Sequence, residues 1–259
     1  MYNRGMYDII DSHCHLDFDA FNCDRNAVIE RACSKGIKHI VIPGVKRSSW
    51  RFIQEICGNN TQLHACYGLH PYLAGEHTDN DIIQLRQWLD DNDCVAVGEC
   101  GLDYRNNQAD KSVQLKFFNA QIEIAHTTSK PAVVHSVHAT EDVINCIKNF
   151  PGLRGMVHSY SGSYEQAIHL INLGFYISIG GAITYDNAKK LRATASEIPL
   201  ESILLETDAP DQPDADHFNQ RNEPAYLVNV LKCLSELRDE PIEEIAKQTT
   251  RNAQNLFNI

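Results

Sequence analysis

Eight short apolar runs, rich in β-branched residues, recur along the 259-residue chain and alternate with longer amphipathic stretches. The runs lie near residues 8–13, 39–44, 63–69, 94–99, 131–136, 154–159, 174–180 and 202–207. Several are almost continuously apolar, without the alternation of apolar and polar residues that a half-exposed strand shows. Continuous apolar runs of this length are typical of parallel strands that are buried on both faces. The pattern therefore predicts a parallel sheet in a protein of the α/β class.

Helices are expected between the strands, at 24–35, 47–58, 80–91, 110–129, 139–149, 163–173 and 187–196, with two more at 223–237 and 241–256. Eight strands that alternate with helices over this length are the count of a (β/α)8 TIM-type barrel. A doubly wound open sheet is the alternative, but no Gly-x-Gly-x-x-Gly turn follows the first strand. Because no low-complexity linker or internal repeat divides the sequence, we expect one domain over residues 1–259.

The composition limits the binding partners and the cellular compartment that we expect for this protein. A formal charge of −11 argues against electrostatic binding of nucleic acid over a large part of the surface, although it allows local electrostatic binding. No run approaches the roughly 18 apolar residues that a membrane span needs. The nine cysteines form no Cys-x-x-Cys pair, and residues 1–6 lack the apolar core of a secretion signal. We therefore expect a cytoplasmic protein with no membrane partner and no obligate protein partner.

The first predicted strand runs into the sequence DSHCHLD at 11–17. Because side chains alternate along a strand, His13 and His15 point to the same side and Cys14 to the other. Two imidazoles that project together from a strand end can chelate one divalent metal ion. A single His-x-His pair also arises by chance, so its meaning depends on what the other strand ends carry.

Other predicted strands are also followed at their C-terminal ends by a histidine or a carboxylate residue. These residues are His70 after the third strand, Glu99 after the fourth, His135 after the fifth, His158 after the sixth, and Glu206 and Asp208 after the eighth. In a barrel, the C-terminal ends of the strands converge on one face and supply the catalytic groups. We therefore expect these side chains to meet His13 and His15 at one site.

Six of these residues form a donor set that suits divalent metal ions: His13, His15, Glu99, His135, His158 and Asp208. Zn, Mn and Ni accept such ligands, and Mg is a weaker candidate because it prefers oxygen ligands and several waters. Since six ligands exceed what one tetrahedral zinc takes, two ions per chain bridged by Glu99 is the economical interpretation. Two carboxylates and two divalent ions leave the loaded site at about +2, which would attract an anionic substrate. A metal-activated water is the expected nucleophile, with Asp208 as ligand and proton acceptor.

Three residues have alternatives that the sequence leaves open. His70 could contact substrate or could be a hydrogen-bonded structural histidine. Glu206 points inward with Asp208 by the alternation rule, but a supporting or structural role has at least as much weight as ligation. Asn222, in the sequence RNEP at 221–224, could belong to an anion contact or to a helix start with Pro224 in its first turn.

Motifs along the whole chain resemble those of the TatD family of metal-dependent hydrolases, within the amidohydrolase-like barrels. They occur in family order as DSHCHLD (11–17), GLHPY (68–72), VGECGLDYR (97–105), VVHS (133–136), VHSYSGS (157–163), LLETDAP (204–210), RNEPAYL (221–227) and TTRNAQNLF (249–257). The resemblance implies a TIM-type barrel that carries a two-metal phosphodiesterase site with deoxyribonuclease activity. The family's ligand pattern falls on the same six residues that the strand ends single out.

The resemblance also implies roles around the metal ions. The family's histidine in Gly-x-His-Pro falls on His70, so Asp208, Glu99 and His70 are the expected catalytic residues. Substrate contacts are expected from His70, Tyr104, Arg105 and Asn222, the last of which falls on the family's Asn-x-Pro segment.

The leading hypothesis is a metal-dependent hydrolase of phosphoester bonds, with exonuclease-like action on DNA ends or short single strands. Its partner would be DNA or a nucleotide held through the metal site. The chain has low basicity and no evident groove lined by aromatic and basic residues, which favours binding of a few nucleotides over binding of a long duplex. The alternative is hydrolysis of a small-molecule ester or amide, or of an aminoacyl ester on tRNA, since fold and metals set the reaction type but not the substrate. A scaffold without activity is disfavoured by the complete ligand set with a candidate base.

Overall fold

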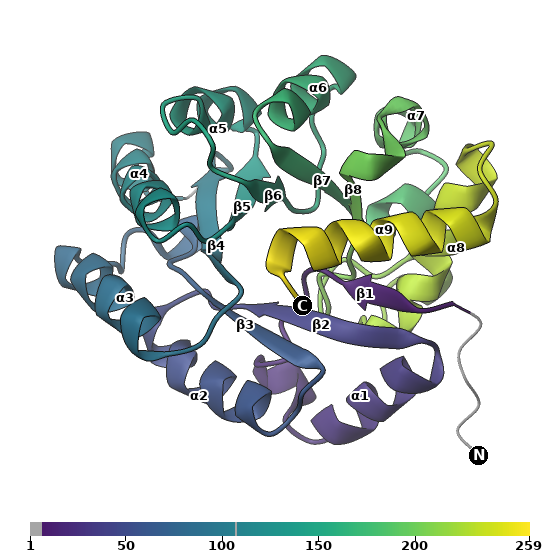
Figure 1. Cartoon of the computed structure of the whole chain (residues 1–259), viewed down its shortest axis with the longest axis horizontal. Helices are drawn as coiled ribbons and strands as arrows, with labels where there is room; N and C mark the ends of the chain where they lie inside the picture. Colours follow the sequence, from purple (N-terminus) through teal and green to yellow (C-terminus); the bar gives the residue numbers. More distant parts are fainter. Residues whose placement is uncertain (1–6, 107) are drawn as a thin grey trace.

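The computed structural model describes residues 7–106 and 108–259. Eight parallel strands form one sheet in which each strand lies beside its neighbours in the sequence (Figure 1). Their bounds are β1 Ile9–Asp11, β2 Ile37–Pro43, β3 Leu63–Tyr67, β4 Ala96–Asp103, β5 Ala132–Val137, β6 Gly155–Val157, β7 Phe175–Ile179 and β8 Ile203–Leu205. This sequential order is that of a (β/α)8 barrel, so the predicted fold is confirmed and the doubly wound alternative is wrong.

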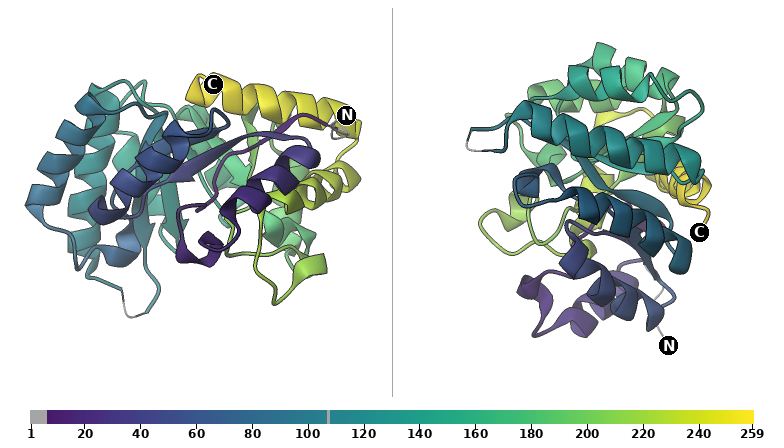
Figure 2. Two further views of the ribbon diagram at one scale, coloured as in Figure 1. Left: turned by 90° about the horizontal axis from the view of Figure 1, so that it is seen from below. Right: turned by 90° about the vertical axis from the view of Figure 1, so that its left-hand side faces the viewer.

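Helices surround the sheet on its outer side, and the last helix lies across one end of the barrel (Figures 1 and 2). They are α1 Arg25–Ser34, α2 Arg47–Gly58, α3 Asp79–Asp91, α4 Lys111–Thr127, α5 Thr140–Ile147, α6 Tyr164–Asn172, α7 Lys189–Glu197, α8 Leu227–Leu237 and α9 Ile242–Phe257. Every helix expected from the sequence is found, with small shifts at its ends. The largest shift is at the start of α8, where Pro224–Tyr226 form a short 3-10 helix ahead of it.

The inside of the barrel holds a small apolar core that α9 closes from one end. Seven of the eight strands contribute one side chain each: Ile10, Val41, Cys66, Ala96, Val133, Met156 and Leu204. Ala253, Leu256 and Phe257 of α9 pack against these side chains, at the end where the strands begin. Figure 2 shows α9 crossing this end, while the loops after β4 and β8 project from the opposite end.

The first and last strands meet through the residues that follow them. The backbone N–H of Ser12 donates to the Leu205 carbonyl over 2.9 Å. Asp11 is fully buried, and its carboxylate accepts hydrogen bonds from the backbone N–H of Thr207 over 3.0 Å and from the Thr207 hydroxyl over 2.6 Å. Both strands are shorter than predicted because these residues leave the regular ladder and bond across the seam. The seam places the residues that follow each strand side by side.

Within the described ranges, no helix is long and apolar enough to cross a membrane. All nine cysteines are free, as expected for a chain without a disulfide framework. Residues 1–6, on which the expectation of no secretion signal rests, lie outside the described residues.

The core beneath α9 predicts a stability effect. Leu256 is 1% exposed, so Leu256→Ala leaves a cavity inside the barrel and is expected to lower the free energy of unfolding by about 2–5 kcal/mol. Gln254→Ala, an exposed position on the same helix, is the matched control and should change it by less than about 0.5 kcal/mol. Urea denaturation measures both. Equal effects of the two substitutions would contradict the packing of α9 against the barrel interior.

Candidate metal centre

A cavity of about 520 Å³ opens where the strands end, at the end of the barrel opposite α9. Its lining includes His15, His70, Glu99, His135, His158 and Asp208. His13 is fully buried and lies beneath the cavity, within 3.5 Å of Glu99 and Asp208. The structure thus brings together all six residues expected to hold metal ions, and it places His70, an expected substrate contact, beside them.

One group of donor atoms is formed by the two histidines after β1 and two carboxylates. The Nε2 atoms of His13 and His15 face each other at 3.2 Å. Glu99 Oε2 lies 3.2 Å from the first and 3.4 Å from the second of these nitrogens. Asp208 Oδ1 lies 3.4 and 3.5 Å from the same two atoms. Four donor atoms therefore converge on one small volume.

A second group surrounds the other oxygen of the same carboxylate. Glu99 Oε1 lies 2.8 Å from His158 Nε2, 3.0 Å from His135 Nδ1 and 3.1 Å from His70 Nε2. The two nitrogens of His135 and His158 are themselves 3.0 Å apart. Each oxygen of Glu99 thus belongs to a different set of imidazole nitrogens, which is the arrangement expected of a bridging carboxylate.

The donor atoms fit divalent cations. Two imidazole nitrogens that face each other at 3.2 Å share at most one proton between them, and Glu99 Oε2 is buried without a hydrogen-bond partner in the described residues. A buried, unpaired carboxylate oxygen is costly unless a positive charge lies beside it. Nitrogen and oxygen donors in this number are ligands that first-row divalent metals accept. We therefore assign the cavity floor as a candidate metal centre.

The protonation equilibria show the same demand for positive charge. Burial opposes protonation of His158, but the carboxylates of Glu99 and Glu206 outweigh it and raise the pKa of this imidazole well above its usual value. Burial also disfavours the ionised form of Glu99, yet the surrounding histidines hold its pKa well below the usual range. Without a cation, protons on imidazoles such as that of His158 supply the positive charge beside Glu99.

His70 is placed to donate a hydrogen bond. Its Nδ1 accepts the backbone N–H of Tyr72 over 3.0 Å, so the proton of the neutral ring lies on Nε2. Burial lowers the pKa of His70 to about 4, although the nearby Glu99 opposes this change, and the ring is therefore neutral at pH 7. The Nε2–H group faces Glu99 Oε1 and the cavity. This tautomer makes His70 a donor to an oxygen atom and not a metal ligand.

Asp103, the last residue of β4, supports the second group through His135. His135 Nε2 lies 3.1 Å from Asp103 Oδ2, which leaves Nδ1 of the same ring directed at Glu99. The guanidinium of Arg105 donates to both Asp103 oxygens, at 2.9 and 3.0 Å. Burial opposes ionisation of Asp103, but the hydrogen bonds from His135 and Arg105 outweigh it and lower the pKa of this carboxyl group. Sequence reasoning missed Asp103, although alternation along β4 places residues 99 and 103 on the same side. It was missed because β4 extends four residues beyond the predicted end.

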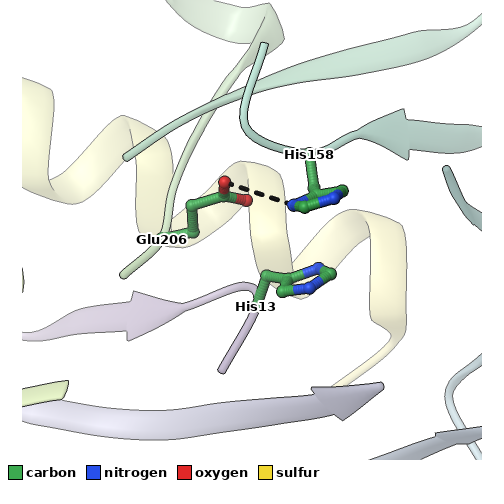
Figure 3. Close-up of side chains that lie close together, drawn as sticks. All are labelled: His13, His158 and Glu206. Atoms are coloured by element: carbon green, nitrogen blue, oxygen red, sulfur yellow. Dashed lines mark ion pairs between the residues drawn. The ribbon is translucent and has the colours of Figure 1, made fainter. Parts of the chain in front are cut away.

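Glu206 lies next to His13 and His158, which belong to the first and the second donor group respectively (Figure 3). The rings of His13 and His158 stack at 4.0 Å with an angle of 10° between them, and their Nε2 atoms belong to different donor groups. Their Nδ1 atoms have no hydrogen-bond partner among the described residues, and Glu206 lies beside them, with Oε1 3.6 Å from His158 Nδ1. The backbone N–H of Ser159 fixes Glu206 Oε1 over 2.6 Å. Glu206 is therefore positioned to accept the Nδ1 protons that these rings carry when Nε2 binds a metal ion.

Asp208 is held in a strained backbone conformation. Its φ angle is 55°, in the left-handed region that residues other than glycine rarely adopt. The Asp208 N–H donates to the His13 carbonyl over 2.9 Å, and Gln212 Nε2 donates to Oδ2. These two bonds leave Oδ1 free to face the histidines after β1. Gln212 is a second residue near the site that sequence reasoning missed, because it lies in a loop without a periodic pattern.

A family model described as TatD related DNase matches residues 10–258. The chain belongs to this TatD-related family. The uncharacterized metal-dependent hydrolase YjjV of Escherichia coli strain K12 is 36% identical over 253 residues, which cover 96% of this chain and 98% of that protein. YabD of Bacillus subtilis strain 168, also described as an uncharacterized metal-dependent hydrolase, is 34% identical over 253 residues, which cover 97% and 99%.

Solved structures agree with this assignment. The crystal structure of YjjV from E. coli K12 superposes with a TM-score of 0.94 at 36% identity and covers 100% of both chains. A TatD family hydrolase from Entamoeba histolytica has a TM-score of 0.85 at 22% identity and covers 98% of this chain and 99% of that one, which shows a shared fold. The expected TatD-family barrel is therefore confirmed at the level of fold and family.

In this TatD-family chain, two of the expected substrate contacts lie outside the cavity lining, while Arg105 and His70 line it. The hydroxyl of Tyr104 donates to Asp142 Oδ2 over 2.8 Å, on the side of α5. Asn222 is buried, and its Nδ2 donates to the carbonyls of Thr207 and Asp211 over 2.9 and 2.8 Å. Asn222 therefore holds the shape of the loop that carries Asp208 instead of facing the cavity itself.

The position of Glu206 predicts an effect on metal affinity. Removal of an acceptor behind a metal-bound histidine typically weakens metal binding by about 10–100-fold, so Glu206→Gln is expected to lower affinity for Zn²⁺ or Mn²⁺ by at least about tenfold. Glu201→Gln, at an exposed position ahead of β8, is the control. Competition with a chromophoric chelator measures affinity, and circular dichroism checks the fold. An unchanged affinity in a folded Glu206→Gln variant would show that Glu206 has no part in holding the histidines.

Proposed function

We propose that this TatD-family chain is a metal-dependent hydrolase that cleaves phosphodiester bonds in DNA, acting at ends or on short single strands. The observation that carries the proposal is the Glu99 carboxylate, whose two oxygens belong to two different nitrogen-rich donor groups. A pair of divalent ions bridged by a carboxylate is a recurrent arrangement in phosphatases and nucleases. We further propose that residues 1–259 act as one domain in the cytoplasm.

The residues of the chain have distinct roles in this reaction. His13, His15, Glu99, His135, His158 and Asp208 would hold two divalent ions. Ions in that position supply Lewis acidity to the phosphoryl oxygen and lower the pKa of a coordinated water. Asp208 Oδ1 faces the cavity and accepts the proton that the attacking water loses. The water oxygen bonds to phosphorus as the bond to the departing oxygen breaks, and that oxygen takes a proton from solvent.

His70 positions the substrate in this proposal. Its Nε2–H group lies at the cavity surface and can turn from Glu99 Oε1 to a non-bridging oxygen of the phosphate. Because the ring is neutral, it contributes a hydrogen bond and no charge. Its role differs from that of Asp208, which takes up a proton.

Charge and size favour a short anionic substrate. The two carboxylates and two divalent ions leave the loaded centre at about +2, which reverses locally the effect of the overall charge of −11. The guanidinium of Arg105 is already paired with Asp103 and adds little net charge to the cavity. A volume of about 520 Å³ lies within the usual range for pockets that enclose small ligands. It suits one or two nucleotides and not a length of duplex.

The proposal is tested by removal of the proposed base and of one proposed ligand. Asp208→Asn is expected to lower the metal-stimulated turnover of labelled single-stranded DNA by at least about 100-fold, and His13→Ala should have a similar effect. His39→Ala is the matched control, because His39 pairs with His64 at 2.8 Å near the other end of the strands. Parallel assays use a chromogenic phosphodiester, a carboxylic ester and an aminoacyl-tRNA.

The outcomes separate the candidate reactions. Loss of DNA cleavage in Asp208→Asn and His13→Ala, with His39→Ala unaffected and the fold retained, supports the proposal. Full nuclease activity in pure Asp208→Asn protein would contradict it. Turnover of the ester or the aminoacyl-tRNA without turnover of either phosphodiester would move the function to the alternative hydrolytic class.

A further inference from the structure

A second cavity, of about 410 Å³, lies beside the metal cavity and shares Asp211 and Gln212 with it. Gln212 stands between the two. Its Nε2 donates to Oδ2 of Asp208, and the Ser159 hydroxyl donates to its Oε1 over 2.7 Å. The second cavity therefore adjoins the proposed general base through Gln212, so a group bound there would lie next to a phosphate held at the proposed metal centre.

An exposed aromatic ring forms one wall of this second cavity. Phe218 is 62% exposed, and the ring of Tyr185 lies edge-on to it, with 6.2 Å between the centroids and 78° between the planes. In the described part of the chain, the exposed large hydrophobic side chains are Tyr72, Ile83, Tyr164 and Phe218, with exposed fractions from 38% to 62%. Two of them, Tyr72 and Phe218, line the two adjacent cavities. Exposed aromatic rings are thus concentrated around the proposed site.

The loop that carries Phe218 is held in place by hydrogen bonds and by ring stacking. The buried carboxylate of Asp214 accepts the backbone N–H groups of Asp216 and His217 over 3.0 and 3.2 Å. The ring of His217 stacks on Tyr226 at 3.5 Å with 7° between the planes. The short 3-10 helix Ala215–His217 directly precedes Phe218. The ring is therefore exposed on an ordered support, which lowers the entropy lost when a ligand stacks on it.

The polar lining indicates which kind of group the cavity accepts. Carboxamides of Gln212, Asn219 and Gln220 offer both donors and acceptors. Asp211 brings a carboxylate, and the lining residues described include no lysine or arginine. A phosphate would meet a negative charge without a counter-charge, whereas a neutral, planar group with polar edges would find an aromatic face and hydrogen-bonding partners. Nucleobases have this chemistry.

We propose that the second cavity is a nucleobase subsite, in which Phe218 stacks on the base of a nucleotide whose phosphate lies at the metal centre. The proposal rests on the proposed phosphodiesterase function and adds to it a determinant of substrate choice. Stacking on an aromatic face is tolerant of base identity, so the subsite favours nucleotides over simple phosphodiesters without strong sequence preference.

A matched pair of substrates tests the stacking. Loss of one base–aromatic stack changes a binding constant by roughly 5- to 150-fold, so Phe218→Ala is expected to lower kcat/KM for a single-stranded oligonucleotide by about tenfold or more. The same oligonucleotide with abasic terminal nucleotides should already be a poor substrate, and Phe218→Ala should change its kcat/KM less than twofold. Tyr164→Ala, at an exposed aromatic residue on α6, is the control, and Phe218→Trp should retain activity. An equal loss on the normal and abasic substrates would overturn the proposal.

A binding measurement separates this proposal from the proposed reaction. Adenosine and thymidine carry a base but no phosphate, and they are titrated into metal-free Phe218→Trp protein while its added tryptophan fluorescence is followed against wild type. Saturable quenching by both nucleosides, and none by ribose, supports the subsite even if no phosphodiester is cleaved, a result that would contradict only the hydrolytic function. Absence of quenching in a protein that cleaves DNA would overturn the subsite and leave the hydrolytic function standing.

Discussion

The buried carboxylate of Glu99 is the group around which the site is built. It is 1% exposed, and nitrogens of five histidines lie within 3.5 Å of its two oxygens. A carboxylate in such a place is stable only with positive charge around it, whether as protons on imidazoles or as metal ions. Since each oxygen faces its own group of nitrogens, the same residue that requires cations also supports the proposal of two positions for them.

The barrel makes this arrangement possible by fixing residues that are far apart in the sequence. The seam between β1 and β8, held by Asp11 and Thr207, places His13 next to Asp208. The apolar core under α9 fills the opposite end, so stability and chemistry are separated along the barrel axis. Left-handed φ angles of 55° at Asp208 and 44° at Ser159 occur at the site, where the surrounding hydrogen bonds hold them.

Much of the fold and of the site could be predicted from the sequence because both depend on short-range periodicity. Alternation predicted His13 and His15 on one side and Cys14 on the other. The two imidazoles meet at 3.2 Å, whereas the Cys14 sulfur lies 3.6 Å from the Ala209 carbonyl. The strand ends identified the residues that gather around Glu99.

Periodicity could not give strand lengths or loop paths, which depend on contacts between distant residues. Asp103 escaped prediction because β4 runs past its apparent end, supported by its pairing with β5 as far as Val137. The carboxamide of Asn222 bonds to the Thr207 and Asp211 carbonyls and so shapes the loop after β8. That loop lines most of the second cavity, which could not be predicted from any pattern in the sequence.

We propose that Glu99 bridges two divalent ions, and anomalous diffraction from crystals soaked in Mn²⁺ would locate them. Two anomalous peaks roughly 3.5–4 Å apart are expected, with one Glu99 oxygen beside each. His13 and His15 should contact one peak and His135 and His158 the other. A single peak at full occupancy, or two peaks that both lie away from Glu99, would contradict the proposed bridging role of Glu99.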